Sequence, residues 1–376
     1  TYCTTSAMTM REGDSLPRRT KDVPLSPKIV PCNEDPLKEP LMNHMNRKIW
    51  NVPEQEHTPY DVYQNRKAHR REFLKFMGYG LGIAGFADLL SGCKQATQEE
   101  IEQAGAVEPL PEESRSVYPA PRNKTFEYGR PETVEKEAVE FTNFYEFTGP
   151  TSKESWKYVE DFKTTPWSVS IEGECAKPRT LDLDDLYKEM KFEERAYRHR
   201  CVETWAMCVP WTGFPLSSLL KLVEPKATAK YVSFETFNKP NEAPYMKSSG
   251  PTTWPWPYTE ALTIEESMND LAFIATGLYG NPLLKQSGAP IRLVVPWKYG
   301  FKSGKSIVKI KLTTEQPATF WNTVNPNEYG FVANVNPKVS HPRWSQRTEW
   351  MLGTEKRYDT QLYNGYEEFV GDLYPS

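Results

Sequence analysis

The sequence predicts a mixed, β-rich α+β fold. Three stretches, "WSVSI" (167–171), "KYVSFET" (230–236) and "SIVKIKL" (306–312), alternate apolar and polar residues as half-buried strands do. Long helical patterns between them are few, which disfavours a doubly wound parallel sheet built from strand–helix–strand units. The expected architecture is therefore sheets with short helices attached.

The other elements are also short. "LDLDDL" (181–186) is typical of a capped helix start, and "LSSLLKL" (216–222) predicts a second helix. "PIRLVV" (290–295) predicts a further strand. All of these lie within residues 136–376, which we expect to form the folded domain.

Composition excludes several classes of protein. A net charge of -4 over 376 residues argues against a dedicated nucleic-acid binder. Six cysteines, at positions 3, 32, 93, 175, 201 and 208, are too few and too uneven for a disulfide framework. Five histidines give no His-x-x-x-His pair and the cysteines no Cys-x-x-Cys, so a zinc site has little support.

Residues 65–93 have the three-part order of an export signal: a basic opening, a mild apolar run and small residues. Arg70-Arg71-Glu72-Phe73-Leu74-Lys75 resembles the twin-arginine consensus, and Leu90-Ser91-Gly92-Cys93 resembles a lipobox. We expect export to the periplasm by the twin-arginine machinery, with Cys93 as a candidate lipid anchor. A cytosolic amphipathic helix is the alternative. The upstream segment 1–64 is unusual before a signal, and a mis-assigned start is one explanation.

Residues 94–135 are rich in Glu, Pro and Ala and lack apolar periodicity. This composition predicts a mostly disordered acidic tether.

Cys201 follows Arg198, His199 and Arg200. Cationic neighbours favour the thiolate, which is the form of cysteine that attacks or binds metal. The alternative is a small buried side chain in an apolar stretch.

The loop "YGFKSGKS" (299–306) looks like a Walker loop, but only three residues separate Gly300 from Gly304 and a strand pattern follows. It is not a nucleotide-hydrolase loop. Lys302 and Lys305, with Arg292 nearby in sequence, are candidates for holding a phosphate. A solvated basic turn is the alternative.

Seven motifs carry a family resemblance. In order they are "TNFYEF" (142–147), "RCVETWAM" (200–207), "FET" (234–236), "GAPIRLVVPWKYGFK" (288–302), "KSIVKIKLT" (305–313), "EYGFVANVNP" (328–337) and "HPRWSQ" (341–346). They closely resemble the catalytic subunits of the periplasmic protein-methionine-sulfoxide reductases, from Phe141 to Gln346. The resemblance implies a single catalytic domain of the sulfite-oxidase fold, with one molybdenum held by one molybdopterin.

The resemblance implies a role for each matched residue. Cys201 would be the protein thiolate ligand of molybdenum, with Arg198 and Arg200 helping to keep it deprotonated. Tyr145, Glu146, Thr236, Arg292, Ser303, Gly304 and Lys305 match positions that hold the pterin and its phosphate. Two positions depart from the family: Thr142 and Ser287 replace asparagines, and Ser303-Gly304 also replaces a Gly-Ile pair.

The implied reaction is removal of oxygen from methionine sulfoxide residues of exported proteins, giving methionine and water. Glu203 is the candidate proton donor, Tyr145 and Asn143 would border the pocket, and "WPWPY" (254–258) would form an aromatic rim. Structural roles are the alternative for each. Cys175 and Cys208 are expected to be structural, with a disulfide between them as the alternative.

Two other functions stay open. A sulfite-oxidase-like enzyme normally follows its cysteine with Ala-Gly-Asn-Arg, whereas Glu203 in Val-Glu-Thr-Trp would repel sulfite. A non-catalytic exported lipoprotein is disfavoured by retention of Cys201, Arg292 and Lys305. The chain has no haem-attachment motif, so the resemblance implies a membrane haem-b subunit as electron donor, with oxidised periplasmic proteins as substrates.

Overall fold

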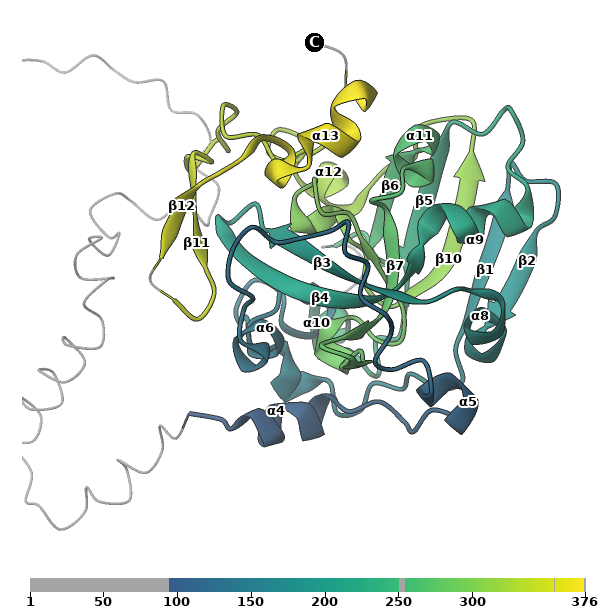
Figure 1. The fold of residues 1–376 in the computed structure, drawn as a ribbon, viewed down its shortest axis with the longest axis horizontal. Coiled ribbons are helices and arrows are strands. Elements are labelled where there is room, and N and C mark those ends of the chain that lie inside the picture. The colour runs from purple at the N-terminus through teal and green to yellow at the C-terminus, as the bar shows by residue number, and fades with distance from the viewer. Residues whose placement is uncertain (1–94, 250–253, 355, 375–376) are drawn as a thin grey trace, which may run out of the picture. The chain divides into compact units, whose positions relative to one another are not determined.

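The structure is a computed structural model that describes residues 95–249, 254–354 and 356–374. Two mixed β-sheets form its centre, and short helices pack around them (Figure 1). The expected α+β class is confirmed.

The smaller sheet has five strands in the order β2-β1-β10-β5-β6. β1 pairs with β10 in parallel, and the other neighbours are antiparallel. β5 buries every second side chain, as its alternating sequence predicts. The strand bounds are β1 Ser168–Gly173, β2 Arg179–Asp182, β5 Tyr231–Thr236, β6 Thr259–Thr263 and β10 Ile307–Thr313.

The larger sheet has seven strands. Its main path is β12-β11-β4-β7-β8, with β3 paired to β4 and β9 paired to β7. β3 and β4 form a long antiparallel pair, and β11 joins β4 in parallel. The bounds are β3 Glu193–Arg200, β4 Trp205–Pro215, β7 Phe273–Leu278, β8 Asn281–Pro282, β9 Arg292–Val294, β11 Thr348–Met351 and β12 Arg357–Asp359.

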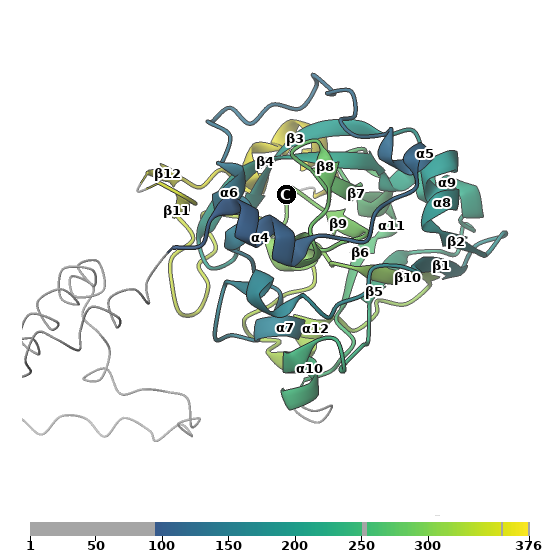
Figure 2. The ribbon, with the colours of Figure 1, turned by 90° about the horizontal axis from the view of Figure 1, so that it is seen from below.

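The helices are short. Three of them, α7, α10 and α12, gather at one end of the domain (Figure 2). No helix in the described ranges has the length and apolar character needed to cross a membrane. The α-helices are α4 Gln98–Gly105, α5 Glu112–Arg115, α6 Glu135–Glu140, α7 Tyr145–Thr148, α8 Leu183–Glu189, α9 Leu216–Val223, α10 Pro244–Ser249, α11 Ile264–Met268, α12 Phe320–Val324 and α13 Glu367–Val370. The 3-10 helices are η4 Ser155–Tyr158, η5 Lys285–Ser287, η6 Gly300–Lys302, η7 Leu362–Gly365 and η8 Gly371–Leu373.

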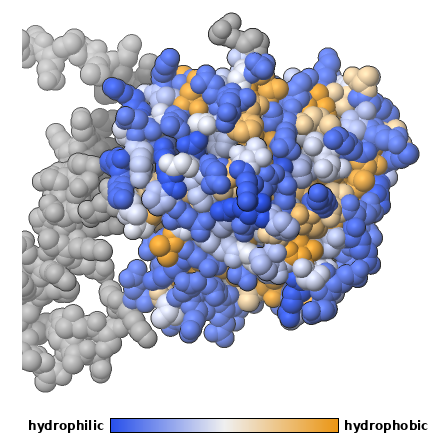
Figure 3. All heavy atoms as spheres, viewed as in Figure 1, coloured by the Kyte–Doolittle hydropathy of each residue, from blue (hydrophilic) through white to orange (hydrophobic). Residues whose placement is uncertain are grey.

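One hydrophobic core spans both sheets and includes large buried side chains such as Trp211, Trp297 and Phe234. The face shown in Figure 3 is mainly hydrophilic, with scattered hydrophobic residues. Apolar side chains of the two sheets therefore pack against each other inside the domain.

The segment expected to be a disordered tether is folded where the structure describes it, from residue 95 to 135. Thr97 caps α4, accepting a hydrogen bond from the Glu100 amide at 3.2 Å, while the Glu100 carboxylate accepts one from the Thr97 amide at 2.7 Å. Ile101 and Phe126 are buried in the core. The expectation is wrong for these residues. Their apolar side chains are too few to give a helical or strand pattern in the sequence, but each one packs into the hydrophobic core of the domain.

The elements expected after residue 136 are present with small shifts. Asp182 caps α8 through the amide of Asp185, and residues 216–222 lie in α9. The strand expected over 306–312 begins at Ile307, because Ser306 has a left-handed φ of 54°. β2, β3, β4, β6, β7, β8, β11 and β12 were not anticipated. The expected signal over 65–93, with Cys93, lies outside the described residues.

Candidate functional site

Cys201 lies at the end of β3, in the tight turn that leads into β4. Its amide donates to the Trp205 carbonyl at 2.9 Å, and the Thr204 amide donates to the Cys201 carbonyl at 3.0 Å. Two donors approach the sulfur: the Glu203 amide at 3.4 Å and the Asn143 side-chain amide at 3.5 Å. The turn therefore fixes the thiol in one place, with hydrogen bonds that suit a sulfur anion.

The arginines before Cys201 point away from the thiol, since neighbouring residues on a strand face opposite sides. The buried Arg200 guanidinium pairs with the Glu349 carboxylate at 2.9 Å, and Arg198 donates to the Gln361 side-chain oxygen at 2.5 Å. Burial raises the pKa of the Cys201 thiol to about 12, and the Glu203 carboxylate adds to this rise. Arg200 lowers this pKa, as expected, but burial outweighs its effect, so the arginines do not hold the free thiol deprotonated. A coordinated metal ion removes the thiol proton by itself.

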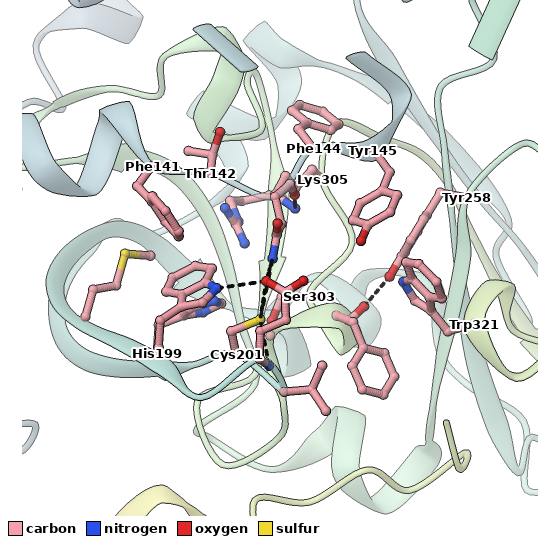
Figure 4. A pocket seen from close by; sticks show the side chains of 18 of the residues that line it. Phe141, Thr142, Phe144, Tyr145, His199, Cys201, Tyr258, Ser303, Lys305 and Trp321 are labelled. Carbon is pink, nitrogen blue, oxygen red and sulfur yellow. Dashed lines mark hydrogen bonds between the residues drawn. The ribbon is translucent and has the colours of Figure 1, made fainter. Parts of the chain in front are cut away.

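The thiol opens into a cavity of about 830 Å³ that reaches solvent. Figure 4 shows His199 and Phe141 on one side of Cys201, and Tyr145, Trp321 and Tyr258 on the other. Seven separate stretches of the chain supply the walls. The lining residues are Phe141, Thr142, Asn143, Phe144, Tyr145, Glu146, His199, Cys201, Val202, Glu203, Trp205, Met207, Tyr258, Arg292, Gly300, Phe301, Ser303, Lys305, Trp321 and Tyr329.

Glu203 lies beside Cys201 and is held by Lys153, whose ammonium is 2.7 and 2.9 Å from its two oxygens. Asn143 and the Trp205 indole also donate to it, at 3.1 and 3.3 Å. Burial pushes the pKa of Glu203 upward, but Lys153 and these hydrogen bonds outweigh it, so the pKa lies below its ordinary value. Glu203 is therefore ionised near neutral pH in this structure, and its role as proton donor stays a prediction.

Six of the nine residues expected to bind cofactor line the cavity. They are Thr142, Tyr145, Glu146, Arg292, Ser303 and Lys305.

The other three lie just behind the wall. The Thr236 hydroxyl is 3.5 Å from a Glu146 oxygen, and the Ser287 carbonyl accepts a hydrogen bond from Arg292 at 2.7 Å. The Gly304 carbonyl accepts one from the Leu293 amide at 2.9 Å. The structure thus brings the expected set together, while the contact each residue makes with a cofactor stays a prediction.

The charges in this cavity fit an anionic cofactor. Arg292 is only 4% exposed, and within the described residues it forms no ion pair. Burial lowers its pKa to about 9, and burial together with Arg292 lowers the pKa of Lys305 to about 7. The Ser287 hydroxyl is buried and has no hydrogen-bond partner among the residues that the structure describes. A phosphate group bound here would pair with both cations and stabilise their charged forms.

Lys302 has a different environment from that of Lys305. It is buried and 2.6 Å from the buried Glu260 carboxylate, so its charge is already balanced by the protein. The loop 299–306 is therefore not a solvated basic turn, the alternative reading of its sequence.

His199 was not anticipated as a cavity residue. Its ring lies over Trp205, and a Cβ at Gly300 would lie 2.4 Å from its Nε2 atom, so only glycine leaves room for it. Burial lowers the pKa of His199 to about 3, with Arg292 and Lys305 adding to the effect. His199 precedes Cys201 by two residues, and residues two apart on a strand face the same side. This spacing was the signal in the sequence that could have placed His199 in the cavity.

Trp321 and Tyr329 were also missed, and nothing in their local sequence marks them. The expected rim at 254–258 is present in part among the described residues. Tyr258 lines the cavity, whereas Trp254 stacks on Phe320 behind the wall at 5.7 Å between ring centroids. All three cysteines in the described part of the chain, Cys175, Cys201 and Cys208, are free thiols.

Comparison with known proteins places this site in a family. The family model described as "Oxidoreductase molybdopterin binding domain" matches residues 156–321. The MsrP catalytic subunit of a protein-methionine-sulfoxide reductase from Burkholderia mallei is 41% identical over 338 residues, covering 86% of this chain and 93% of that protein.

Other matches vary in strength. The corresponding subunit from Pseudomonas syringae pv. tomato is 51% identical over 243 residues, which are 64% of this chain and 72% of that protein. The sulfane dehydrogenase SoxCD of Paracoccus pantotrophus aligns with a TM-score of 0.38 and 15% identity, over 62% of this chain and 56% of that one. This last likeness is too slight to bear on function. The long, nearly full-length match shows that the chain belongs to the MsrP family of protein-methionine-sulfoxide reductase catalytic subunits.

Proposed function

We propose that this chain catalyses the molybdenum-dependent reduction of methionine sulfoxide residues in proteins to methionine. The observation that carries the proposal is the Cys201 thiol, fixed in an open cavity that is also lined by two cations, the buried Arg292 and the half-buried Lys305. The names of the relatives support the substrate.

The cavity residues fit a molybdopterin cofactor. Cys201 would be the protein's sulfur ligand, and Arg292 and Lys305 would hold the phosphate group. Bound in this way, the cofactor supplies a metal able to accept an oxygen atom and to pass electrons. Tyr145, Glu146 and Ser303 line the same cavity and are the further candidates for pterin contacts. Thr142 is a weaker candidate, because its hydroxyl is already hydrogen-bonded to Ser155.

The reaction consumes two electrons and two protons: a sulfoxide becomes a thioether, and its oxygen leaves as water. Glu203 is the carboxylate closest in sequence to the thiol, and Lys153 and Asn143 fix its orientation. We propose that Glu203 takes up a proton from solvent and passes it toward the substrate oxygen. The electrons come from outside this chain, and a membrane haem-b subunit is the proposed donor.

Oxidation of sulfite fits the cavity less well. Sulfite is a dianion, and the Glu203 carboxylate lies beside the thiol. Its charge would oppose binding of a dianion but would not oppose a neutral sulfoxide. A binding module without cofactor is disfavoured, since Arg292 would then remain a buried charge with no ion pair in the described part of the chain.

We further propose export to the periplasm. The twin-arginine pattern at residues 70–75 and the lipobox ending at Cys93 support this localisation and a lipid anchor. Oxidised proteins of that compartment would be the substrates.

The test is molybdenum content by elemental mass spectrometry, on natively produced protein and on Cys201→Ala. We expect about one molybdenum per chain, absent in the variant, and loaded protein that reduces methionine sulfoxide rather than oxidising sulfite. Wild-type protein that is folded and metal-free, or loaded but active on sulfite alone, would overturn the proposal. Cys208→Ala is the matched control, because Cys208 is buried in β4 and does not line the cavity.

A further inference from the structure

The half of the cavity opposite His199 is aromatic. Trp321 lies between Tyr145 and Tyr329, with ring centroids 4.9 Å from each. All three rings line the same cavity as Cys201, and Figure 4 shows Tyr145 and Trp321 on one side of the thiol. Because Arg292 and Lys305 suit the anionic cofactor, the aromatic half is the part left for substrate.

The aromatic rings are supported from behind. Trp254 contacts the Trp321 ring edge-on at 5.7 Å and the Tyr145 ring at 6.0 Å. Phe320 stacks on Trp254 and lies edge-on to Trp321. The indole and the phenol are thus part of a packed cluster, so the shape of this wall is set before any ligand arrives.

The hydroxyls of Tyr145 and Tyr329 have no hydrogen-bond partner among the described residues. Both residues line the cavity into which the Cys201 thiol and the Glu203 carboxylate open. Burial raises the pKa of both, to about 12 for Tyr329, so both keep their protons near neutral pH. Two residues of this wall therefore each carry a phenol donor without an acceptor, in the cavity that Cys201 also lines.

A methionine sulfoxide carries the hydrogen-bond acceptor that these two hydroxyls lack. Its S–O oxygen is a strong hydrogen-bond acceptor, whereas the sulfur of the product thioether is a weak one. The methyl and methylene groups next to sulfur pack well against aromatic rings. Trp321 would hold this apolar part in the substrate and in the product alike.

We propose, building on the function above, that the hydroxyls of Tyr145 and Tyr329 recognise the sulfoxide oxygen and that Trp321 binds the flanking methyl and methylene groups. The Tyr145 hydroxyl would then serve the substrate and not the pterin, to which the resemblance assigned this residue. The site thereby distinguishes substrate from product: removal of the oxygen leaves both hydroxyls without an acceptor, and the thioether departs. Lys153 and Asn143 are engaged with Glu203, so these two phenols are the free donors in this wall.

The test compares binding of N-acetylmethionine sulfoxide and N-acetylmethionine to the oxidised holoenzyme, without an electron donor, by ligand-observed NMR. We expect Tyr145→Phe and Tyr329→Phe each to raise the Kd of the sulfoxide about threefold to tenfold, the usual effect of one lost hydrogen bond. The Kd of the thioether should stay within about twofold. In turnover, the KM for the sulfoxide should rise in parallel.

Two further variants sharpen the result. Trp321→Leu should weaken both ligands, and Trp321→Phe, which keeps a ring, should recover most of the loss. Tyr231→Phe is the matched control: Tyr231 is half-buried on β5 and lies outside the cavity, so binding should not change.

The inference is overturned if the Tyr145→Phe/Tyr329→Phe double variant binds the sulfoxide as wild type does, or loses both ligands equally. Failure of the proposed function would look different. A wild-type holoenzyme that binds the sulfoxide through these hydroxyls but does not reduce it would leave the recognition site standing and refute the activity.

Discussion

Arg292→Met should have opposite effects on the cofactor-free and the cofactor-loaded protein. Arg292 is buried, and burial lowers its pKa from 12.5 to about 9. At pH 7, below both values, the charged side chain therefore opposes folding by roughly 5 kcal/mol, at 1.36 kcal/mol for each pKa unit. Two contacts of Arg292 stabilise the folded state by about 1 kcal/mol each: its hydrogen bond to the Ser287 carbonyl and its position over the Trp211 ring.

The difference predicts that Arg292→Met stabilises cofactor-free protein by roughly 2–3 kcal/mol. In loaded protein the sign reverses, because the phosphate loses its guanidinium partner, and molybdenum content should fall strongly. Urea unfolding at pH 7 of cofactor-free protein measures the first effect, and elemental analysis measures the second. Above pH 9 the folded protein loses the Arg292 proton while the unfolded chain keeps it, so the wild type gains stability as the pH rises. The difference in unfolding free energy between Arg292→Met and wild type should therefore shrink above pH 9.

Lys298→Met is the control for this reasoning. Lys298 is equally buried, but its ammonium pairs with Glu266 at 2.5 Å. Burial lowers the pKa of Lys298 too, to about 8, but its partner differs: removing Lys298 leaves the buried Glu266 carboxylate unpaired, which should cost about 3–5 kcal/mol. If Arg292→Met destabilises the cofactor-free protein as much as Lys298→Met, Arg292 is an ordinary structural cation and the charge argument fails.

Three further changes test other parts of the structure. Glu349→Gln leaves the buried Arg200 without a carboxylate partner and should cost about 3 kcal/mol in urea unfolding. His341 has a pKa lowered by burial, so stability should begin to fall as pH drops below 6.5, where the unfolded chain takes up the proton; His341→Gln should flatten this slope. Gly288→Ala places a Cβ 2.9 Å from that of Lys305, at a φ of 102°, and should reduce molybdenum content severalfold.

Each of these changes has its own contrary result. Glu189→Gln, in the exposed pair with Arg179, should cost less than about 1 kcal/mol, and an equal cost for Glu349→Gln would contradict the burial argument. An unchanged pH slope in His341→Gln would assign the acid sensitivity to other groups. Gly330→Ala meets nothing within 4 Å, so molybdenum loss in that variant as well would show a general defect.

The sequence predicted best where one strand face is buried and the other is exposed. β1, β5 and the second half of β10, from Ile310 on, alternate in this way, and all three strands were found. β4 was missed because ten of its eleven residues are buried and it contains Pro210, so neither alternation nor composition marks it.

The site was partly predictable for a different reason. Motif resemblance located Cys201, Arg292 and Lys305, which are distant in sequence but line one cavity. It did not give the direction of the side chains, so Arg200 was assigned to the thiol although it pairs with Glu349 on the other side of the strand. Trp321 is brought in by α12, and no local pattern reports such a tertiary contact.

The Arg200–Glu349 pair has a consequence for the smallest unit that can be produced. The matched molybdopterin-binding region ends at residue 321, but the carboxylate that neutralises Arg200 lies 28 residues beyond it, in β11. The wall formed by residues 141–146 precedes that region. A fragment trimmed to the matched boundaries would therefore lose one side of the cavity and expose an unbalanced charge next to Cys201. The region matched by the family model is thus shorter than the unit that folds cooperatively. Expression of residues 156–321 alone should give insoluble protein.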